Sequence, residues 1–355
     1  MWMIKFVEGA KMSQKHLNLI YAIKDGIGIS IESVESGLKC NCTCPSCGAV
    51  LVAKKGSKMV HHFAHHSVDD CEYGYETSLH LAAKDIISKA QKITVPPVYV
   101  SFPDSPKRDE LYYESREINI DKVELEKKFG NIIPDIVIHA CGKIFYLEIY
   151  VTHKIDEAKL AKIKKANIST IEVDLSSIDR TITYKDLKNI LLSDSKEKAW
   201  KYNVAAENKL KQFYANADKR TLMSRGFAIH VDNCPIKIRT WKGRAYANFI
   251  DDCMGCQYCI STNKDIGLLC SGRTRIASIK DFDIPQNIRI ENSNAEIRKS
   301  KQAYIVSGYC PNCSHKLVKR HGKFGSFLGC SNYPHCKFGT VNSFAQISSD
   351  ILAEV

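Results

Sequence analysis

The sequence predicts an α/β protein in which a mixed sheet flanked by helices is joined to three small β-rich zinc-binding modules. Two observations support this. Between residues 136 and 175, two β-rich segments, a helical segment and a further β-rich segment follow one another, as in a hairpin followed by a parallel crossover. The cysteines fall into clusters on both sides of that region. We therefore expect an N-terminal zinc-binding element at 1–74, an α/β core at 75–195, a connector and middle cysteine-rich ribbon at 196–296, and a basic C-terminal finger and tail at 297–355.

Composition favours a cytoplasmic protein with more than one domain. The chain has 355 residues, of which 44% are hydrophobic and 25% are charged. No apolar run is long enough to cross a bilayer, and residues 1–12 lack the apolar core of a signal peptide, so we expect no membrane partner. Fifteen cysteines without an export signal indicate metal sites and not disulfides.

The net charge of +12 is concentrated near the C-terminal end. Residues 297–340 contain eight Lys or Arg residues and no Asp or Glu. A stripe this basic attracts phosphate backbones, so DNA is the expected partner. The alternative is a solvated surface that only keeps the protein soluble.

The N-terminal module begins with two predicted strands at 19–34 around an Asp-Gly turn. Cys44-Pro-Ser-Cys47-Gly has the spacing of a zinc knuckle, and a tetrahedral site needs two more ligands. Candidates follow at His61, His62, His65, His66 and Cys71. We favour Cys44, Cys47, His65 and Cys71; the alternative is free thiols and surface histidines.

A helix is predicted over 72–92. Glu76, His80 and Lys84 recur at i, i+4 and i+8 and form one polar stripe, which is either a solvent-exposed face or part of a site. A proline-rich stretch at 96–106 ends this region, and 111–120 is expected to form the first strand of the core.

The hairpin at 136–151 places two acidic residues together. If Cys141-Gly142 is a two-residue loop, Ala140 pairs with Lys143, and Asp135 then lies opposite Glu148. Opposed residues have Cβ atoms roughly 5 Å apart, so the carboxylates repel unless a cation lies between them, and a hard divalent cation is the usual one. The alternative is a salt-bridged or solvated hairpin.

Regular structure continues after the hairpin. We expect a helix at 156–166, a buried parallel strand at 170–175, a helix at 184–192 and a charged helical connector at 193–209. Thr152 and His153 either contact substrate phosphate or cap the first of these helices, and capping is favoured.

Pro134-Asp135, twelve intervening residues and Glu148 resemble the PD-(D/E)xK signature of the restriction-endonuclease-like nucleases. Tyr150 occupies the position at which that family usually has lysine, and Lys84, Lys154 and Lys159 are candidates for a displaced lysine. Together with HHFAH and the Glu-His-Lys helix, the stretch 44–176 resembles the competence protein CoiA family.

This resemblance implies a zinc element fused to a nuclease core, with DNA as the substrate. It implies Glu76, Asp135 and Glu148 as the carboxylates that bind Mg²⁺ or Mn²⁺. Lys84 and Lys159 are the alternatives for the catalytic lysine. By analogy, the roles in view are competence and DNA uptake, recombination, repair and defence. The alternative is an inactive DNA-binding scaffold whose nuclease core has degenerated.

The middle ribbon is predicted to contain strands over 227–250, with a turn at Lys242-Gly243. Its cysteines fit a zinc site on Cys234, Cys253, Cys256 and Cys270. They fit less well an iron–sulfur cluster on Cys253, Cys256, Cys259 and Cys270.

The C-terminal module has the clearest spacing. Cys310, Cys313, Cys330 and Cys336 form a closed structural zinc site. The string GKFGSFLGCSNYPHC resembles the C-terminal zinc finger of bacterial type I DNA topoisomerases, which implies binding of single-stranded or branched DNA. Candidate contacts are Lys316, Lys319, Arg320, Lys323, Phe324, Phe327 and Tyr333. The alternative is a purely structural knuckle with buried aromatics.

Overall fold

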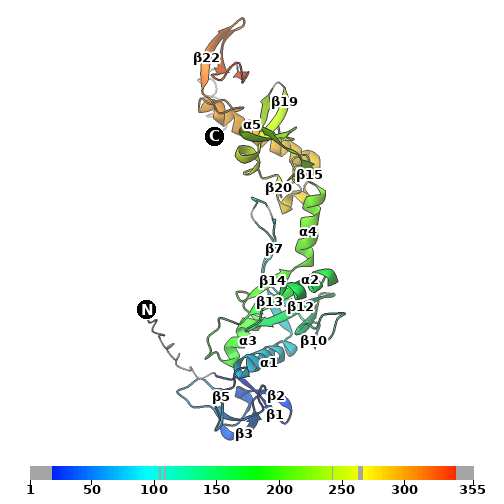
Figure 1. Cartoon of the computed structure of the whole chain (residues 1–355), viewed down its shortest axis with the longest axis vertical. Coiled ribbons are helices and arrows are strands. Elements are labelled where there is room, and N and C mark those ends of the chain that lie inside the picture. Colours follow the sequence, from blue (N-terminus) through cyan, green and yellow to red (C-terminus); the bar gives the residue numbers. More distant parts are fainter. Residues whose placement is uncertain (1–17, 104, 108, 242, 263–266, 341–355) are drawn as a thin grey trace, which may run out of the picture. The chain divides into compact units, whose positions relative to one another are not determined.

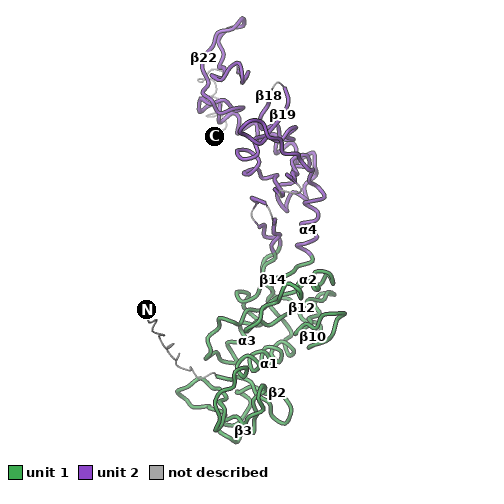
Figure 2. The backbone as a smooth tube through the Cα atoms, in the orientation of Figure 1, with its two compact units in different colours: residues 1–98, 113–204 green, residues 99–112, 205–355 purple. Residues whose placement is uncertain are grey.

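The computed structural model describes residues 18–103, 105–107, 109–241, 243–262 and 267–340. It confirms a mixed α/β protein with several sheets (Figure 1). The chain divides into two compact units (Figure 2), residues 1–98 with 113–204 and residues 99–112 with 205–355. Among the described helices, none has the length and apolar character needed to span a membrane.

The first unit opens with a five-stranded antiparallel sheet of order β2-β1-β3-β4-β5. Asp25 and Gly26 both have positive φ, which gives the tight turn predicted between the first two strands. Leu19, Leu51 and Phe63 are fully buried in its core. The elements are β1 (Tyr21–Lys24), β2 (Ile27–Ser30), the short helix η1 (Ile31–Ser33), β3 (Gly37–Thr43), β4 (Val50–Lys54) and β5 (His62–His65).

Helix α1 (Gly74–Ser88) follows this sheet and packs against it. The Ser78 hydroxyl accepts a hydrogen bond from the Tyr21 amide and donates one to the Tyr21 carbonyl, both at 2.9 Å. The apolar flank of α1, including Leu79 and Ile87, is buried in the core of the central sheet. The helix is therefore held between the N-terminal module and the central sheet.

The central sheet has the order β10-β11-β12-β13-β14. The predicted register is confirmed: Ala140 pairs with Lys143 and Ile136 with Leu147, and Cys141 and Gly142 have the positive φ values of a two-residue turn. Strand β13 runs parallel to β12, as predicted. The strands are β10 (Lys122–Leu125), β11 (Ile136–Ala140), β12 (Lys143–Tyr150), β13 (Thr170–Asp174) and β14 (Lys198–Tyr202).

Helices cover both faces of this sheet. Ile136 and Ile138 pack with α1 and α3 (Tyr184–Leu192) on one face. Val137 and Tyr146 pack with Ile163 of α2 (Glu157–Ala166) on the other. Because side chains alternate along a strand, Glu148 faces the same way as Tyr146, toward α2.

Two predictions about the segments next to the central sheet were wrong. Residues 111–120 do not form the first strand of the central sheet; they hold β8 (Glu110–Tyr113) and β9 (Arg116–Asn119), which pair with β7 (Val98–Val100) and β6 (Lys92–Val95). The charged segment 193–209 is not one helix, because β14 interrupts it before α4 (Val204–Ala215). Trp200 and Tyr202 favour an extended segment, and pairing with β13 outweighs the helical propensity of the flanking lysines.

In the described residues from 205 onward, the second unit holds most of α4, three small sheets and the longer helix α5. The strands predicted over 227–250 are confirmed, although Lys242 of the predicted turn lies outside the described residues. The 21-residue helix α5 (Gln286–Val306) was not predicted, because few apolar residues recur along it. The remaining elements are β15 (Asp218–Arg220), β16 (Leu222–Arg225), β17 (Ala228–Asp232), β18 (Arg239–Trp241), β19 (Arg244–Asn248), η2 (Phe249–Cys253), β20 (Cys259–Ser261), β21 (Leu268–Cys270), η3 (Ile279–Asp283), β22 (Leu317–Gly322), β23 (Gly325–Cys330) and β24 (Gly339–Thr340).

Candidate active site and metal centres

The N-terminal cluster brings together Cys44, Cys47, His65 and Cys71, whose ligand atoms lie within 4.8 Å of one another. The Cys44 and Cys71 sulfurs are 3.7 Å apart, and Cys47 Sγ is 3.4 Å from His65 Nε2. The other ring nitrogen, His65 Nδ1, lies 3.1 Å from Asp70 Oδ1, a partner that orients Nε2 toward the sulfurs. Three thiols and an oriented imidazole fit a structural zinc ion.

Two residues beside this cluster, His62 and Gly74, are not ligands, but their positions show how the cluster is enclosed. His62 is buried with Nδ1 2.8 Å from the Val60 carbonyl, so it points elsewhere. Gly74, the first residue of α1, has no room for a side chain, because a Cβ there would lie 2.8 Å from Cys71 Sγ. Helix α1 therefore begins directly against the ligands.

A hydrogen bond from the backbone amide of Ala49 is the largest of the effects that lower the pKa of the Cys47 thiol to about 7. This lower pKa favours the thiolate, which is the form that metals bind.

The C-terminal cluster gathers Cys310, Cys313, Cys330 and Cys336 within 4.8 Å. The Cys310 and Cys336 sulfurs are 3.7 Å apart, and those of Cys313 and Cys330 are 3.3 Å apart. The Asn332 amide donates to Cys330 Sγ at 3.4 Å. Four thiols from two turns at this spacing fit a structural zinc ion with no open coordination position.

The hairpin of this module presents cations and aromatics. Phe324 at its tip is 98% exposed and Tyr333 is 59% exposed, whereas Phe327 is half-buried against Gly322 and Gly339. The Arg320 guanidinium lies 5.4 Å from the centre of the Tyr333 ring and donates to the Cys330 carbonyl. The remaining predicted contacts, Lys316, Lys319 and Lys323, are exposed. Of the three predicted stacking residues, two are open to a ligand.

The middle cysteines are arranged differently. Cys234, Cys253, Cys256 and Cys270 line one cavity. In the part of the chain that the structure describes, however, no three metal-ligand atoms here lie within 4.8 Å of one another.

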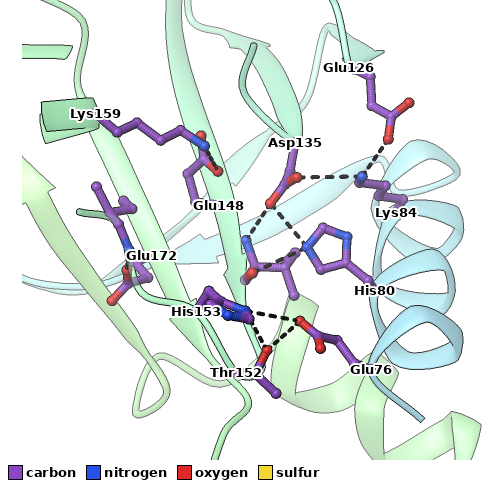
Figure 3. Close-up of polar contacts among 12 residues, drawn as sticks. Glu76, His80, Lys84, Glu126, Asp135, Glu148, Thr152, His153, Lys159 and Glu172 are labelled. Carbon is purple, nitrogen blue, oxygen red and sulfur yellow. Dashed lines mark hydrogen bonds and ion pairs between the residues drawn. The ribbon is translucent and has the colours of Figure 1, made fainter. Parts of the chain in front are cut away.

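A second cavity, of about 230 Å³, lies at the end of the central hairpin and is lined by most of the predicted nuclease residues (Figure 3). Asp135, just before β11, accepts a hydrogen bond from the Ile149 amide at 2.9 Å through Oδ2. The same oxygen is 3.3 Å from His80 Nε2, and Oδ1 is 3.5 Å from Lys84 Nζ. Two members of the polar stripe on α1 therefore face this carboxylate and not solvent.

Glu148 lies deeper, with its side chain 7% exposed. Its Oε2 is 2.6 Å from Lys159 Nζ of α2, whereas Oε1 is buried without a hydrogen-bond partner among the described residues. Burial, followed by the charge of Asp135, raises the pKa of Glu148 to about 7 against the effect of Lys159. Burial alone would also raise the pKa of Asp135, but His80, the Ile149 amide and Lys84 hold it well below its usual range.

Glu76 lines the same cavity but is bonded elsewhere. Its Oε1 accepts a hydrogen bond from the Thr152 hydroxyl at 2.5 Å and lies 3.7 Å from His153 Nδ1, and Figure 3 shows it turned toward these two residues. Within the described ranges, Glu76, Asp135 and Glu148 do not gather within 4.8 Å.

The prediction that Thr152 or His153 caps helix α2 was wrong. Asp156 is the N-cap, and its side chain accepts a hydrogen bond from the Lys159 amide at 2.6 Å. Residues 153–156 have no regular secondary structure and helix α2 begins only at Glu157, so Thr152 and His153 precede its first turn and contact Glu76 instead.

One buried carboxylate was missed. Glu172 of β13 is directly in register with Glu148, is 3% exposed and lines the same cavity. Its oxygens are 2.5 Å from Lys201 Nζ and 2.9 Å from the Ile155 amide. A glutamate flanked by buried β-branched residues in TIEVD was the available signal.

The candidate lysines occupy distinct positions. Lys159 contacts Glu148, and Lys84 lies between Asp135 and Glu126, whose Oε1 is 2.7 Å away. Lys154 lies 5.1 Å from the centre of the Tyr150 ring. Of these three lysines, Lys84 and Lys159 form ion pairs with the two central carboxylates in the part of the chain that the structure describes.

Comparison with known proteins identifies two segments. Residues 30–74 match the family described as competence protein CoiA, N-terminal domain, and residues 307–341 match the topoisomerase DNA binding C4 zinc finger. No solved structure matches the chain.

Curated relatives include DNA topoisomerase 1 of Mycoplasmoides gallisepticum (58% identical over 38 residues, 11% of this chain and 5% of the relative). Those of Helicobacter pylori (37% over 60 residues, 17% and 8%) and Methanocaldococcus jannaschii (61% over 66 residues, 19% and 8%) are similar too. The chain thus spans less than a tenth of the length of each of these relatives. It joins a segment similar to the CoiA N-terminal domain to one similar to the topoisomerase C4 zinc finger.

Proposed function

We propose that this protein is a metal-dependent DNA nuclease, with the cavity around Asp135 and Glu148 as its active site. The observation that carries this proposal is the pair of adjacent carboxylates in which Glu148 Oε1 is buried without a described partner. A buried carboxylate oxygen is costly unless it is paired, and a hard divalent cation between two carboxylates would pair it.

The arrangement of elements supports a restriction-endonuclease-like core. Helix α1 precedes the antiparallel strands β10, β11 and β12, and α2 then connects to the parallel strand β13. The carboxylates lie at the end of the β11–β12 hairpin, where α1 and α2 both reach the same cavity. The likeness of 30–74 to the CoiA N-terminal domain agrees with this interpretation.

Asp135 and Glu148 would hold Mg²⁺ or Mn²⁺, with Glu76 at the rim of the cavity as the third acidic group. When bound, such an ion supplies Lewis-acid stabilisation of the scissile phosphate and an activated water. Lys159, whose side chain is 32% exposed beside Glu148, is placed to bind a phosphate oxygen or orient the water. Lys84 would keep Asp135 ionised from the opposite side.

The fingers would bring DNA to this site. The family matched by 307–341 is described as DNA binding, and its module here has exposed aromatics beside cations. Exposed rings stack on unpaired bases while lysines contact phosphates, so single-stranded or branched DNA is the expected ligand. Competence, recombination, repair and defence are all roles that such an activity could serve.

A second candidate function is an inactive DNA-binding scaffold. The observation that favours it is that both carboxylates already have cationic partners, Lys159 at 2.6 Å from Glu148 and Lys84 at 3.5 Å from Asp135. Such ion pairs can stabilise a buried acidic cluster without a metal.

Cleavage assays separate the two functions. Labelled single-stranded, duplex and branched DNA would be incubated with Mg²⁺, Mn²⁺ or EDTA, with Asp135→Ala and Glu148→Ala beside the unchanged protein. Glu157→Ala, an exposed acidic residue on α2, is the matched control. We expect metal-dependent cutting that both site variants lose while they still bind DNA. Binding without cutting on every substrate would reject the nuclease in favour of the scaffold.

A further inference from the structure

Five cysteines of the second unit converge on one cavity that neither matched family covers. Cys234 follows β17, Cys253 ends η2, Cys256 follows it, and Cys259 and Cys270 lie on the paired strands β20 and β21. All five line a cavity of about 430 Å³, and all are free of disulfides. Its other walls are largely apolar, with Val231, Ile238, Ala247 and Leu268 among them. A buried group of thiols in this setting needs either protons or a metal.

Two of these cysteines have the local geometry of a metal knuckle. The Gly272 amide donates to Cys270 Sγ at 3.3 Å, and a Cβ on Gly272 would lie 3.2 Å from that sulfur. In the C-terminal cluster the amide two residues after Cys330 donates to its sulfur in the same way, at 3.4 Å. The Tyr258 amide, two residues after Cys256, likewise donates a hydrogen bond to the Cys256 sulfur. Amides pointing at sulfur stabilise a thiolate.

Backbone geometry favours four of the five as ligands. The Cys256 amide donates to the Cys253 carbonyl at 3.1 Å, so these two residues close the turn of a Cys-x2-Cys loop. A Cβ on Gly272 would lie 3.2 Å from Cys270 Sγ and 3.4 Å from Cγ of Pro235, so the chain beside Cys234 meets the Cys270 thiol. Cys259 is the most deeply buried of the five, at 2% exposed. A site with four ligands leaves one thiol over, and Cys259 is that thiol.

We propose that Cys234, Cys253, Cys256 and Cys270 bind a third metal centre, with Cys259 as a buried neighbour and not a ligand. The occupant is thiophilic and takes four thiolates, which is true of a single zinc ion and of an iron–sulfur cluster. The sulfurs surround a cavity and are more widely spaced than in the other two clusters. A zinc ion would draw them inward to bonds of about 2.3 Å, whereas a cluster would fill the wider space. The proposal does not depend on nuclease activity.

Metal content of the full-length chain, purified without chelators and without oxygen, tests the proposal directly. We expect either three zinc ions per chain, or two zinc ions together with iron, acid-labile sulfide and visible absorption. Both results support a third centre, and they identify its occupant. Two zinc ions with no iron would overturn it, and this measurement requires no variant to fold.

Four serine substitutions test the ligand set. Cys256→Ser and Cys270→Ser should each lose the third centre and keep the two terminal zinc ions, which report that the rest of the chain is folded. Cys234→Ser should lose it, whereas the matched control Cys259→Ser should retain it. Loss in Cys259→Ser with retention in Cys234→Ser would overturn the assignment, as would a Cys256→Ser protein with unchanged metal content.

Discussion

The C-terminal zinc finger and the carboxylate cavity are both candidate metal sites, yet they are built in opposite ways. All four finger ligands lie within 27 consecutive residues, from Cys310 to Cys336, and two short turns bring them together. The cavity collects Glu76 from α1, Asp135 from the residue just before β11, Glu148 from β12 and Lys159 from α2. In the finger the metal would create the structure, whereas in the cavity the structure exists first and positions the side chains.

This difference predicts how each site fails. A finger without its metal has a small core of five buried residues, too little to fold by itself. The cavity rests on a core that includes Ile136, Leu147 and Ile171, which do not depend on a bound ion. Substitutions in the first site should therefore remove structure, and substitutions in the second should remove chemistry.

The largest effect is expected for Cys330→Ser. Structural zinc contributes on the order of 10–16 kcal/mol to small zinc domains, so loss of one thiolate should unfold residues 307–340, release one zinc ion and abolish DNA binding through this module. Zinc content, DNA gel shifts and limited proteolysis measure these changes. Glu148→Gln is the contrasting variant, which should keep its zinc ions and its DNA affinity. A Cys330→Ser protein that keeps its full zinc content would contradict the prediction that substitutions in the finger remove structure.

The lysines of the cavity come next. Lys159→Met should lower the cleavage rate by about 10²–10³-fold, the range found when one preorganised charge or donor is removed from a transition state. Lys154→Met, at the ring of Tyr150, should change it little and serves as the matched control. Single-turnover cleavage at saturating DNA and metal gives both rates. Equal losses in the two variants would contradict the role given to Lys159.

A smaller effect is expected at the tip of the finger. Phe324→Ala should weaken single-stranded DNA binding by about 1–3 kcal/mol, since one base would lose a stacking partner. Phe227→Ala is the control, because that ring is also fully exposed but lies outside the finger. Fluorescence anisotropy with a labelled oligonucleotide measures both. Unchanged affinity in Phe324→Ala would favour the reading in which the finger is purely structural.

The smallest effect concerns pH. Because the folded protein raises the pKa of Glu148 from 4.5 to about 7, it holds that proton more tightly than the unfolded chain does. This contribution to stability is fully present below about pH 4.5 and is lost as the pH rises through 7.

The affinity for a divalent metal changes with pH in the opposite direction to this stability, because the metal binds the ionised carboxylate. Affinity for Mn²⁺ should fall about fivefold between pH 7 and pH 6, because metal and proton compete for one group whose pKa is about 7. Calorimetric titration at several pH values measures this dependence, and Glu148→Gln should abolish it. A flat profile in the unchanged protein would mean that Glu148 does not bind the metal.

The same contrast explains which features could be predicted from the sequence. The finger ligands follow from spacing alone, and the two-residue turn at Cys141-Gly142 was sufficient to fix the register that pairs Ile136 with Leu147, beside Asp135 and Glu148. Glu172 could not be placed, because its position depends on the register of a parallel pair that no turn specifies. The strands around 110–119 were misplaced because their partners, β6 and β7, are defined by long-range pairing. Helix α5 lacks an apolar stripe, so periodicity gave no signal.

The position of Gly74 has a consequence for dividing the chain. Its backbone lies against the sulfurs of Cys71 and Cys44, and the helix that starts there carries His80 and Lys84 into the acidic cavity. A fragment cut between 74 and 75 would begin inside that helix, without the cluster against which it starts and without the Tyr21 backbone that Ser78 binds. The smallest fragment that keeps the cavity intact should thus include the N-terminal sheet, and moving the cavity to another protein would require moving the cluster of Cys44, Cys47, His65 and Cys71 as well.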